Sequence, residues 1–123
     1  MSRVRNKDTS PEKIVRTTVH RLGYRFRLHR NDLPGKPDLV FPSRHKVIFV
    51  HGCFWHGHQC KRGNRLPKTN QTYWFNKINR NIERDKEHKN KLEIMGWKVL
   101  TIWECEVKNK DFLENVIVSF LDS

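Results

Sequence analysis

The segment HGCFWHGHQC, residues 51–60, holds three histidines and two cysteines within ten positions, with a phenylalanine and a tryptophan between them. Imidazole and thiolate groups are the ligands that zinc prefers, and imidazole is also the side chain best suited to proton transfer near neutral pH. Large rings beside such groups suit contact with nucleic-acid bases. The segment therefore predicts a metal site, a catalytic site or a nucleic-acid contact, or all three together.

A zinc site is the first of these hypotheses. Cys53, His58 and Cys60 lie close enough in sequence to bind one ion, and Cys105, in the later stretch WEC, could complete the site. Three Cys with one His form a common tetrahedral zinc set, and this set uses every cysteine of the chain. Spacing alone does not choose the ligand among the three histidines of the segment. The alternative is three reduced cysteines without a metal, which the density of histidines disfavours.

A second metal site is predicted at Asp38, which begins an expected strand directly after Pro37. The next expected strand ends in Phe49-Val50-His51, and a hairpin would bring these two strand ends together. A carboxylate beside a polar strand end is a common way to hold a divalent cation near a phosphate, and magnesium takes oxygen ligands. A Pro–Asp pair also occurs in many loops by chance, so this motif is weak by itself.

The charge and the aromatic residues both favour a nucleic-acid partner. Lys and Arg number 25 against 13 acidic residues, which gives a formal charge of +12 over 123 residues. Such a charge favours a polyanion, although a generically basic protein is the alternative. Four aromatic residues lie in polar, basic stretches and suit stacking on bases, or else cover a zinc site as core residues: Phe54, Trp55, Tyr73 and Trp74.

The start of the chain, MSRVRNKDTSPE, is basic but is followed by no apolar run, so we expect no secretory signal. No stretch approaches the length of a membrane span, and no strongly apolar helix accompanies the charge, so we expect no membrane partner. Together with cysteines that cannot all pair within one chain, this favours a reduced, cytoplasmic compartment.

Hydrophobic periodicity predicts the elements that position these residues. A helix is expected over 11–22, between Ser10 as its cap and Gly23 as its end, with one apolar face formed by Ile14, Val15, Val19 and Leu22. Strands are expected over 24–29, 38–41, 46–50 and 97–103, the second and third as a hairpin. Further helices are expected over 72–95 and 111–121, the last with a stripe of Phe112, Val116 and Phe120.

These elements predict a single domain over 1–123 with one core, in the α/β class: a small mixed sheet flanked by helices. The long helix carries one acid out of pattern, because Asp85 lies on the apolar stripe marked by Ile78, Ile82 and Leu92. An inward carboxylate is costly unless it is paired. Asp85 therefore either pairs with a Lys or Arg, or orients a histidine or faces a catalytic cleft, and spacing leaves both open.

Five blocks carry a family resemblance. RNKDTSPE, LPGKPDLVFP, VIFVHGCFWHGHQC, NIERDKEH and GWKVLTIWEC occur in this order over about residues 3–105. They resemble the very short patch repair endonucleases of bacteria, the Vsr family. The resemblance implies a restriction-endonuclease-like α/β fold with a structural zinc. It also implies a monomeric, magnesium-dependent enzyme that nicks double-stranded DNA 5′ to the thymine of a T:G mismatch left by 5-methylcytosine deamination.

The same resemblance assigns catalytic roles. It implies that Asp38 and the backbone carbonyl of Val50 bind magnesium, and that His51 acts on the phosphate or assists a proton transfer. It makes His56 the general base or water-positioning residue, with Asp85 as the acid that supports it. His51 takes the position of a lysine in most nucleases of this fold.

The resemblance also implies Glu12 as a further acid of the site, although an acid at the head of a helix also complements the helix dipole. It fixes His58 as the zinc histidine, with Cys53, Cys60 and Cys105 as the other zinc ligands. It names the residues that intercalate in DNA: Phe54, Trp55 and Trp74. A DNA polymerase that completes repair and a coupling protein of mismatch repair are the implied protein partners.

Two departures leave the DNA sequence around the mismatch open. Residues 61–69 do not align with the family's pattern, and little precedes the SRVR stretch. One alternative function is therefore a Vsr-like nickase or restriction-linked nuclease that cuts undamaged DNA. The other is a non-catalytic zinc module that binds DNA, which the presence of Asp38, His51 and His56 disfavours.

Overall fold

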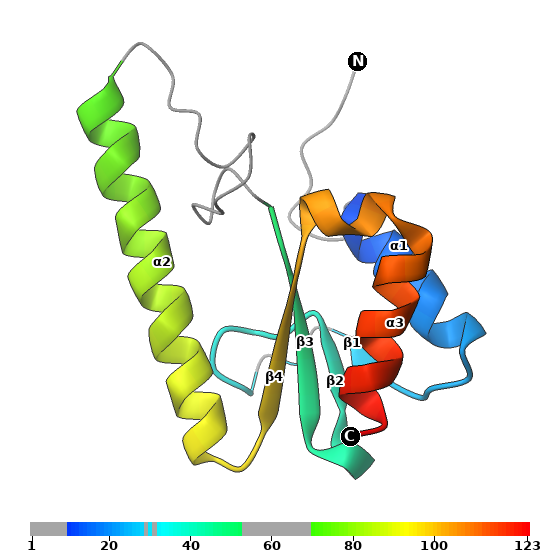
Figure 1. Cartoon of the computed structure of the whole chain (residues 1–123). Coiled ribbons are helices and arrows are strands. Elements are labelled where there is room, and N and C mark those ends of the chain that lie inside the picture. The colour runs from blue at the N-terminus through cyan, green and yellow to red at the C-terminus, as the bar shows by residue number, and fades with distance from the viewer. Residues whose placement is uncertain (1–9, 29, 31, 53–69) are drawn as a thin grey trace.

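The computed structural model describes residues 10–28, 30, 32–52 and 70–123, which form a four-stranded sheet with helices on both faces (Figure 1). Its elements in chain order are α1 (Ser10–Arg21), β1 (Arg27–Leu28), β2 (Leu39–Phe41), the 3-10 helix η1 (Pro42–Arg44), β3 (Lys46–His51), α2 (Gln71–Ile94), β4 (Lys98–Trp103), the 3-10 helix η2 (Glu104–Lys108) and α3 (Lys110–Leu121). No helix in these ranges is long and apolar enough to span a membrane.

The sheet is mixed, with strand order β1-β2-β3-β4. β2 runs antiparallel to both of its neighbours, β1 and β3, and Leu39 faces Ile48 across the β2–β3 hairpin. β4 runs parallel to β3, so that His51 and Trp103 end the two strands side by side. Parallel neighbours need a crossover connection, which here contains α2. The predictions of the α/β class, of the hairpin and of the long helix are therefore confirmed.

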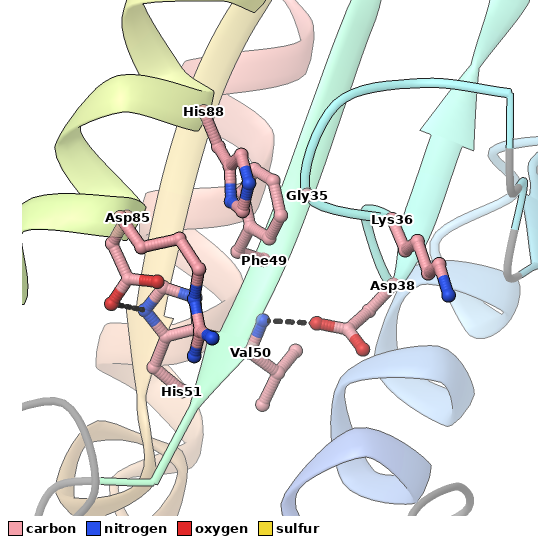
Figure 2. A pocket seen from close by; sticks show the side chains of 9 residues that line it. Gly35, Lys36, Asp38, Phe49, Val50, His51, Asp85 and His88 are labelled. Atoms are coloured by element: carbon pink, nitrogen blue, oxygen red, sulfur yellow. Dashed lines mark hydrogen bonds and ion pairs between the residues drawn. The ribbon is translucent and has the colours of Figure 1, made fainter. Parts of the chain in front are cut away.

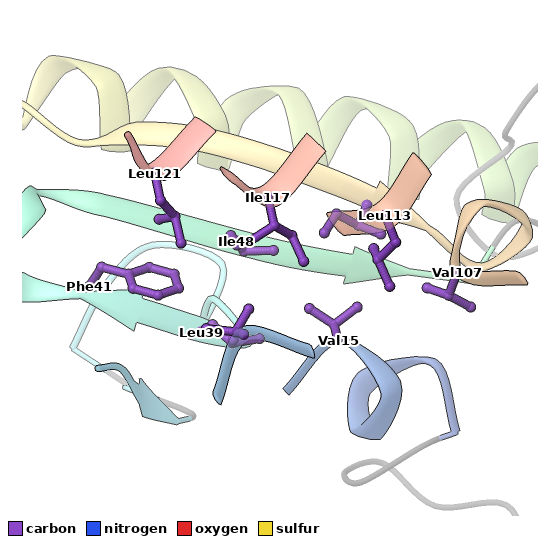
Figure 3. Close-up of a cluster of buried hydrophobic side chains, with 10 residues drawn as sticks. Val15, Leu39, Phe41, Ile48, Val107, Leu113, Ile117 and Leu121 are labelled. Carbon is purple, nitrogen blue, oxygen red and sulfur yellow. The ribbon is translucent and has the colours of Figure 1, made fainter. Parts of the chain in front are cut away.

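Alternation along the strands divides the buried side chains between the two faces of the sheet. One face packs against α1 and α3 and holds the larger cluster, which includes Leu39, Phe41, Ile48, Val15 and Ile117 (Figure 3). The other face packs against the end of α2 and holds Leu33, Val40, Val47, Phe49, Leu92 and Trp97. The described residues thus form two buried clusters, whereas the sequence predicted one core.

The stripe predicted for α3 is wrong by one position. Phe112 is 45% exposed, and the helix instead buries the adjacent stripe of Leu113, Ile117 and Leu121. Two apolar stripes run side by side on this helix. Periodicity alone does not decide which of them is buried, and the prediction chose the stripe with the larger side chains. The sheet selects the branched aliphatic stripe, and Phe120 packs at the border of the same cluster.

The strand predicted over 24–29 is also shorter than expected. Among the described residues of this range, Arg27 and Leu28 pair with Val40 and Leu39 of β2, whereas residues 24–26 lie outside the strand. On α1, Ile14 is 42% exposed although the pattern placed it on the apolar face. Glu12 is only 8% exposed and shares the inner face of α1 with Val15 and Val19. The fold therefore turns a carboxyl group inward at the head of α1.

Candidate active site

A cleft of about 420 Å³ opens at the end of β3, between the turn that precedes β2 and the middle of α2 (Figure 2). It collects residues from three separate stretches of the chain, and each stretch contains a residue predicted to act in catalysis. The residues that line the cleft are Gly35, Lys36, Asp38, Phe49, Val50, His51, Arg84, Asp85 and His88.

Asp38 is held at one side of this cleft by the backbone of β3. Its Oδ2 accepts a hydrogen bond from the N–H of Val50 at 2.6 Å. A residue in a strand directs its N–H and C=O to the same edge, so the Val50 carbonyl also faces the Asp38 side. β2 begins only at Leu39, so the sheet leaves this end of β3 open to the carboxylate. Two oxygen donors, one charged and one neutral, therefore meet at the strand end.

Glu12 lies beside Asp38 and disfavours its ionised form. Burial raises the pKa of Asp38 to about 7 from its ordinary 3.8, and the hydrogen bond and charge of Glu12 also raise it. The N–H of Val50 and, more weakly, the Arg16 guanidinium oppose this rise in pKa. Two carboxyl groups at one buried point repel each other unless they share a proton or a cation. Their hard oxygen atoms fit the donor set that magnesium takes.

The raised pKa of Asp38 predicts a dependence of stability on pH. Between about pH 4 and about pH 7 the folded chain holds a proton on Asp38 that the unfolded chain has lost, so the free energy of unfolding falls as pH rises. Outside this window the carboxyl contributes no slope. We expect the Tm of the wild type, minus that of Asp38→Asn, to fall from pH 4 to pH 7 in thermal melts without magnesium. A difference in Tm that stays constant between pH 4 and pH 7 would contradict a raised pKa for Asp38.

His51 lies at the opposite side of the cleft, next to α2. Its Nδ1 is 3.9 Å from Asp85 Oδ2, within ion-pair range if the ring is protonated but longer than a hydrogen bond. Phe49 and Trp103 flank the imidazole, with ring centroids 5.5 and 5.4 Å away. The side chains of Phe49 and His51 both point to the α2 face because they are two residues apart on β3. The sheet and α2 thus fix the direction of the ring.

Gly35 is the point where the two walls of the cleft touch. Its φ is +76°, and a Cβ added there would lie 2.9 Å from both Cβ and Nδ1 of His88 on α2. A side chain at this position would meet both backbone strain, about 1–2 kcal/mol, and a collision. His88 therefore packs directly on the turn that leads to Asp38.

Gly35→Ala should lower the free energy of unfolding by at least about 1 kcal/mol through these two effects. Adding His88→Ala should recover the part of the collision that involves the imidazole ring, and leave the part that comes from the Cβ of residue 88 and the part that comes from φ. Urea unfolding of the two single variants and the double variant measures this. A fully additive double variant would show that the two residues do not press on each other.

Comparisons with known proteins show which family the chain is similar to. The family model described as DNA mismatch endonuclease Vsr matches residues 1–62. The chain is 52% identical over 122 residues to the Type II nicking enzyme V.XorIIP of Xanthomonas oryzae pv. oryzae, which covers 99% of this chain and 89% of that protein. It is 38% identical over 113 residues to the DNA mismatch endonuclease Vsr of Escherichia coli, covering 92% and 72%. The chain belongs to the Vsr family.

Several residues that the Vsr resemblance assigned lie outside the described residues: Cys53, Phe54, Trp55, His56, His58 and Cys60. Their roles in zinc binding, catalysis and intercalation stay predictions. Cys105 is described and lies half-buried in η2. Trp74 lies half-buried in the first turn of α2, with its ring 5.2 Å from that of Tyr73.

The cleft also shows one predicted residue beside a different histidine, and it contains three residues that the sequence did not single out. Asp85 lies near His51, whereas the Vsr resemblance paired it with His56. Lys36, Arg84 and His88 line the same cleft without having been predicted. His88 follows Asp85 by three residues on α2, and side chains at this spacing lie on one face of a helix. This spacing could have indicated from the sequence that His88 lies near the site.

Proposed function

We propose that this Vsr family member is a magnesium-dependent endonuclease that nicks double-stranded DNA 5′ to the thymine of a T:G mismatch. The observation that carries the proposal is the meeting of Asp38, the Val50 backbone and the His51–Asp85 pair in one cleft. Oxygen donors on one side and an oriented imidazole on the other are what phosphodiester hydrolysis requires. The net charge of +12 suits a DNA substrate.

Asp38 and the Val50 carbonyl would hold the magnesium ion, which supplies positive charge at the phosphate and favours deprotonation of a bound water. Asp38 must give up its proton to do so, and its pKa of about 7 makes that step easy near neutral pH. Glu12 would add a second carboxyl group at the same point.

His51 serves the phosphate from the other side of the cleft. Because its Nδ1 faces Asp85, the opposite ring nitrogen, Nε2, is the atom available to hydrogen-bond a phosphate oxygen or move a proton. When a water oxygen attacks the phosphorus, one P–O ester bond breaks and the departing oxygen needs a proton. His56 remains the proposed general base on the strength of the Vsr resemblance.

A structural zinc ion is part of the proposal, with Cys53, His58, Cys60 and Cys105 as its ligands. Phe54, Trp55 and Trp74 would enter the base stack, which a mispaired step opens at lower cost than a matched one. We further propose a cytoplasmic monomer whose nick is used by a DNA polymerase, with a mismatch-repair coupling protein as a second partner.

The second candidate is a nickase that cuts fully paired DNA. The name Type II nicking enzyme, carried by a relative 52% identical to this chain, keeps this candidate open. Both candidates use the same cleft and differ in how the base pair beside the scissile phosphate is selected.

The deciding experiment is a nicking assay with magnesium on end-labelled duplexes. One set carries a T:G pair in several sequence contexts, and the matched set carries C:G at the same place. A single cut 5′ to the thymine, absent from the C:G set, is the expected result. Equal cutting of both sets would establish the second candidate, and binding without any cut would overturn both.

A further inference from the structure

Two cationic side chains enter the cleft from opposite walls and have no part in the proposed chemistry. Lys36 comes from the turn before β2, and Arg84 comes from α2, directly before Asp85. Figure 2 shows the Lys36 turn facing α2 across the cleft, with Asp38 beside Lys36. Any DNA strand that reached Asp38 would pass between these two walls.

The position of Lys36 is fixed by its turn. Its φ is +51°, a left-handed conformation that few residues with a side chain adopt. Its N–H donates to the carbonyl of Leu33 at 3.1 Å, and Leu33 is itself buried. Gly35, the preceding residue, packs on His88 of α2. The turn thus holds Lys36 in a left-handed backbone conformation on the same wall of the cleft as Asp38.

Neither cation is neutralised within the part of the chain that the structure describes. Arg84 Nη2 donates to the neutral Asn81 Oδ1 at 2.8 Å, and no carboxylate among the described residues forms an ion pair with Lys36. Elsewhere on the surface Lys91 pairs with Glu87 at 2.9 Å. The carboxylates of Asp38 and Asp85 would repel DNA, so cations at the same cleft are needed to bring a phosphate chain close.

We propose that Lys36 and Arg84 together bind one DNA backbone phosphate next to the phosphate that is cut. Arg84 would offer its planar fork to the phosphate oxygens, and Lys36 a compact charge from the other side. The ligand is a phosphodiester monoanion, recognised without regard to base. This inference rests on the proposed function only in requiring that a DNA strand lies in the cleft.

The first test measures duplex binding without added magnesium, where no cutting interferes. Lys36→Met and Arg84→Met should each weaken binding on the order of 10-fold, through loss of a charge-assisted hydrogen bond. Each should also reduce the slope of log K against log salt concentration by about one counterion. Lys98→Met is the matched control, because Lys98 is exposed at the opposite end of the sheet.

The second test locates the phosphate. Duplexes that carry one uncharged methylphosphonate at successive positions around the mismatch are bound to each variant. The wild type should lose affinity when the contacted phosphate is neutralised, whereas Lys36→Met and Arg84→Met should show no further loss at that same position. Lys98→Met should behave as the wild type there.

Three outcomes would overturn the inference: additive losses at every position, two different positions for the two variants, or an equal effect of Lys98→Met. Because the readout is binding, it is independent of cutting. A wild-type chain that nicks no duplex would refute the proposed function. The binding measurements would still decide whether Lys36 and Arg84 contact a phosphate. Circular dichroism of each variant confirms that the comparison is between folded chains.

Discussion

Asp38→Asn is expected to lower the rate of nicking by at least about 10³-fold, the scale of losing a main electrostatic partner of the transition state. The amide keeps the size of the side chain and an oxygen that can accept the N–H of Val50, but it cannot carry the charge that a magnesium ion requires. Single-turnover nicking of the preferred duplex measures the effect.

Binding and folding should survive this change. The carboxyl is already partly neutral near pH 7 in the metal-free chain, because burial raises its pKa to about 7. We therefore expect the affinity for duplex DNA without magnesium to change by less than about threefold, and the Tm at pH 7 to be no lower than that of the wild type. Asp111→Asn, an exposed acid in the first turn of α3, is the control for the charge change. Wild-type nicking by Asp38→Asn would remove Asp38 from the active site.

The parts of the fold that the sequence predicts correctly are those that a strong local pattern decides. Apolar runs over 38–41 and 46–50 with a short connection specify a hairpin, because few other pairings bury both. The long helix ends as predicted because Gly96 adopts a φ of +94° between Ile94 and Lys98. The part of α3 that differs depends on a partner surface, because the sheet decides which stripe of this helix is buried.

The candidate site likewise has parts that the sequence predicts and parts that depend on tertiary packing. Asp38 and His51 were placed together by strand register, which a hairpin fixes within one residue. Asp85 could be recognised as out of pattern, but its partner could not, since 34 positions of chain and a crossover separate it from His51. The contact of Glu12 with Asp38 depends on how α1 crosses the sheet, and the approach of His88 to Gly35 depends on a left-handed turn. None of these arrangements leaves a periodic trace in the sequence.

Removal of zinc is expected to lower the Tm by at least about 10 °C, which corresponds to roughly 2 kcal/mol for a chain of this size. The register of the sheet supports the proposed ligand set. His51 and Trp103 end the parallel pair β3 and β4 side by side. Cys53 lies two positions after His51, and Cys105 lies two positions after Trp103. A bound ion would therefore join the two stretches of chain that leave the same edge of the sheet.

Such a junction would matter for stability because β3 is one of the two inner strands of the sheet and lines the cleft. Structural zinc sites contribute their binding free energy to folding, so losing the ion should loosen the end of β3 and the position of His51 with it. Metal analysis of the purified chain should find one zinc per molecule. A zinc-selective chelator, with magnesium kept in excess, should then lower the Tm, and added zinc should restore it.

Cys105→Ser separates this effect from any action of the chelator itself. The variant should bind less zinc, melt at a lower temperature and respond little to further chelation, because one of four ligands is already lost. Ser119→Ala on α3 is a control for a small change on an exposed surface. A wild-type chain that contains no zinc, or that keeps its Tm after chelation, would leave the three cysteines without a metal and require another explanation for how the ends of β3 and β4 are held.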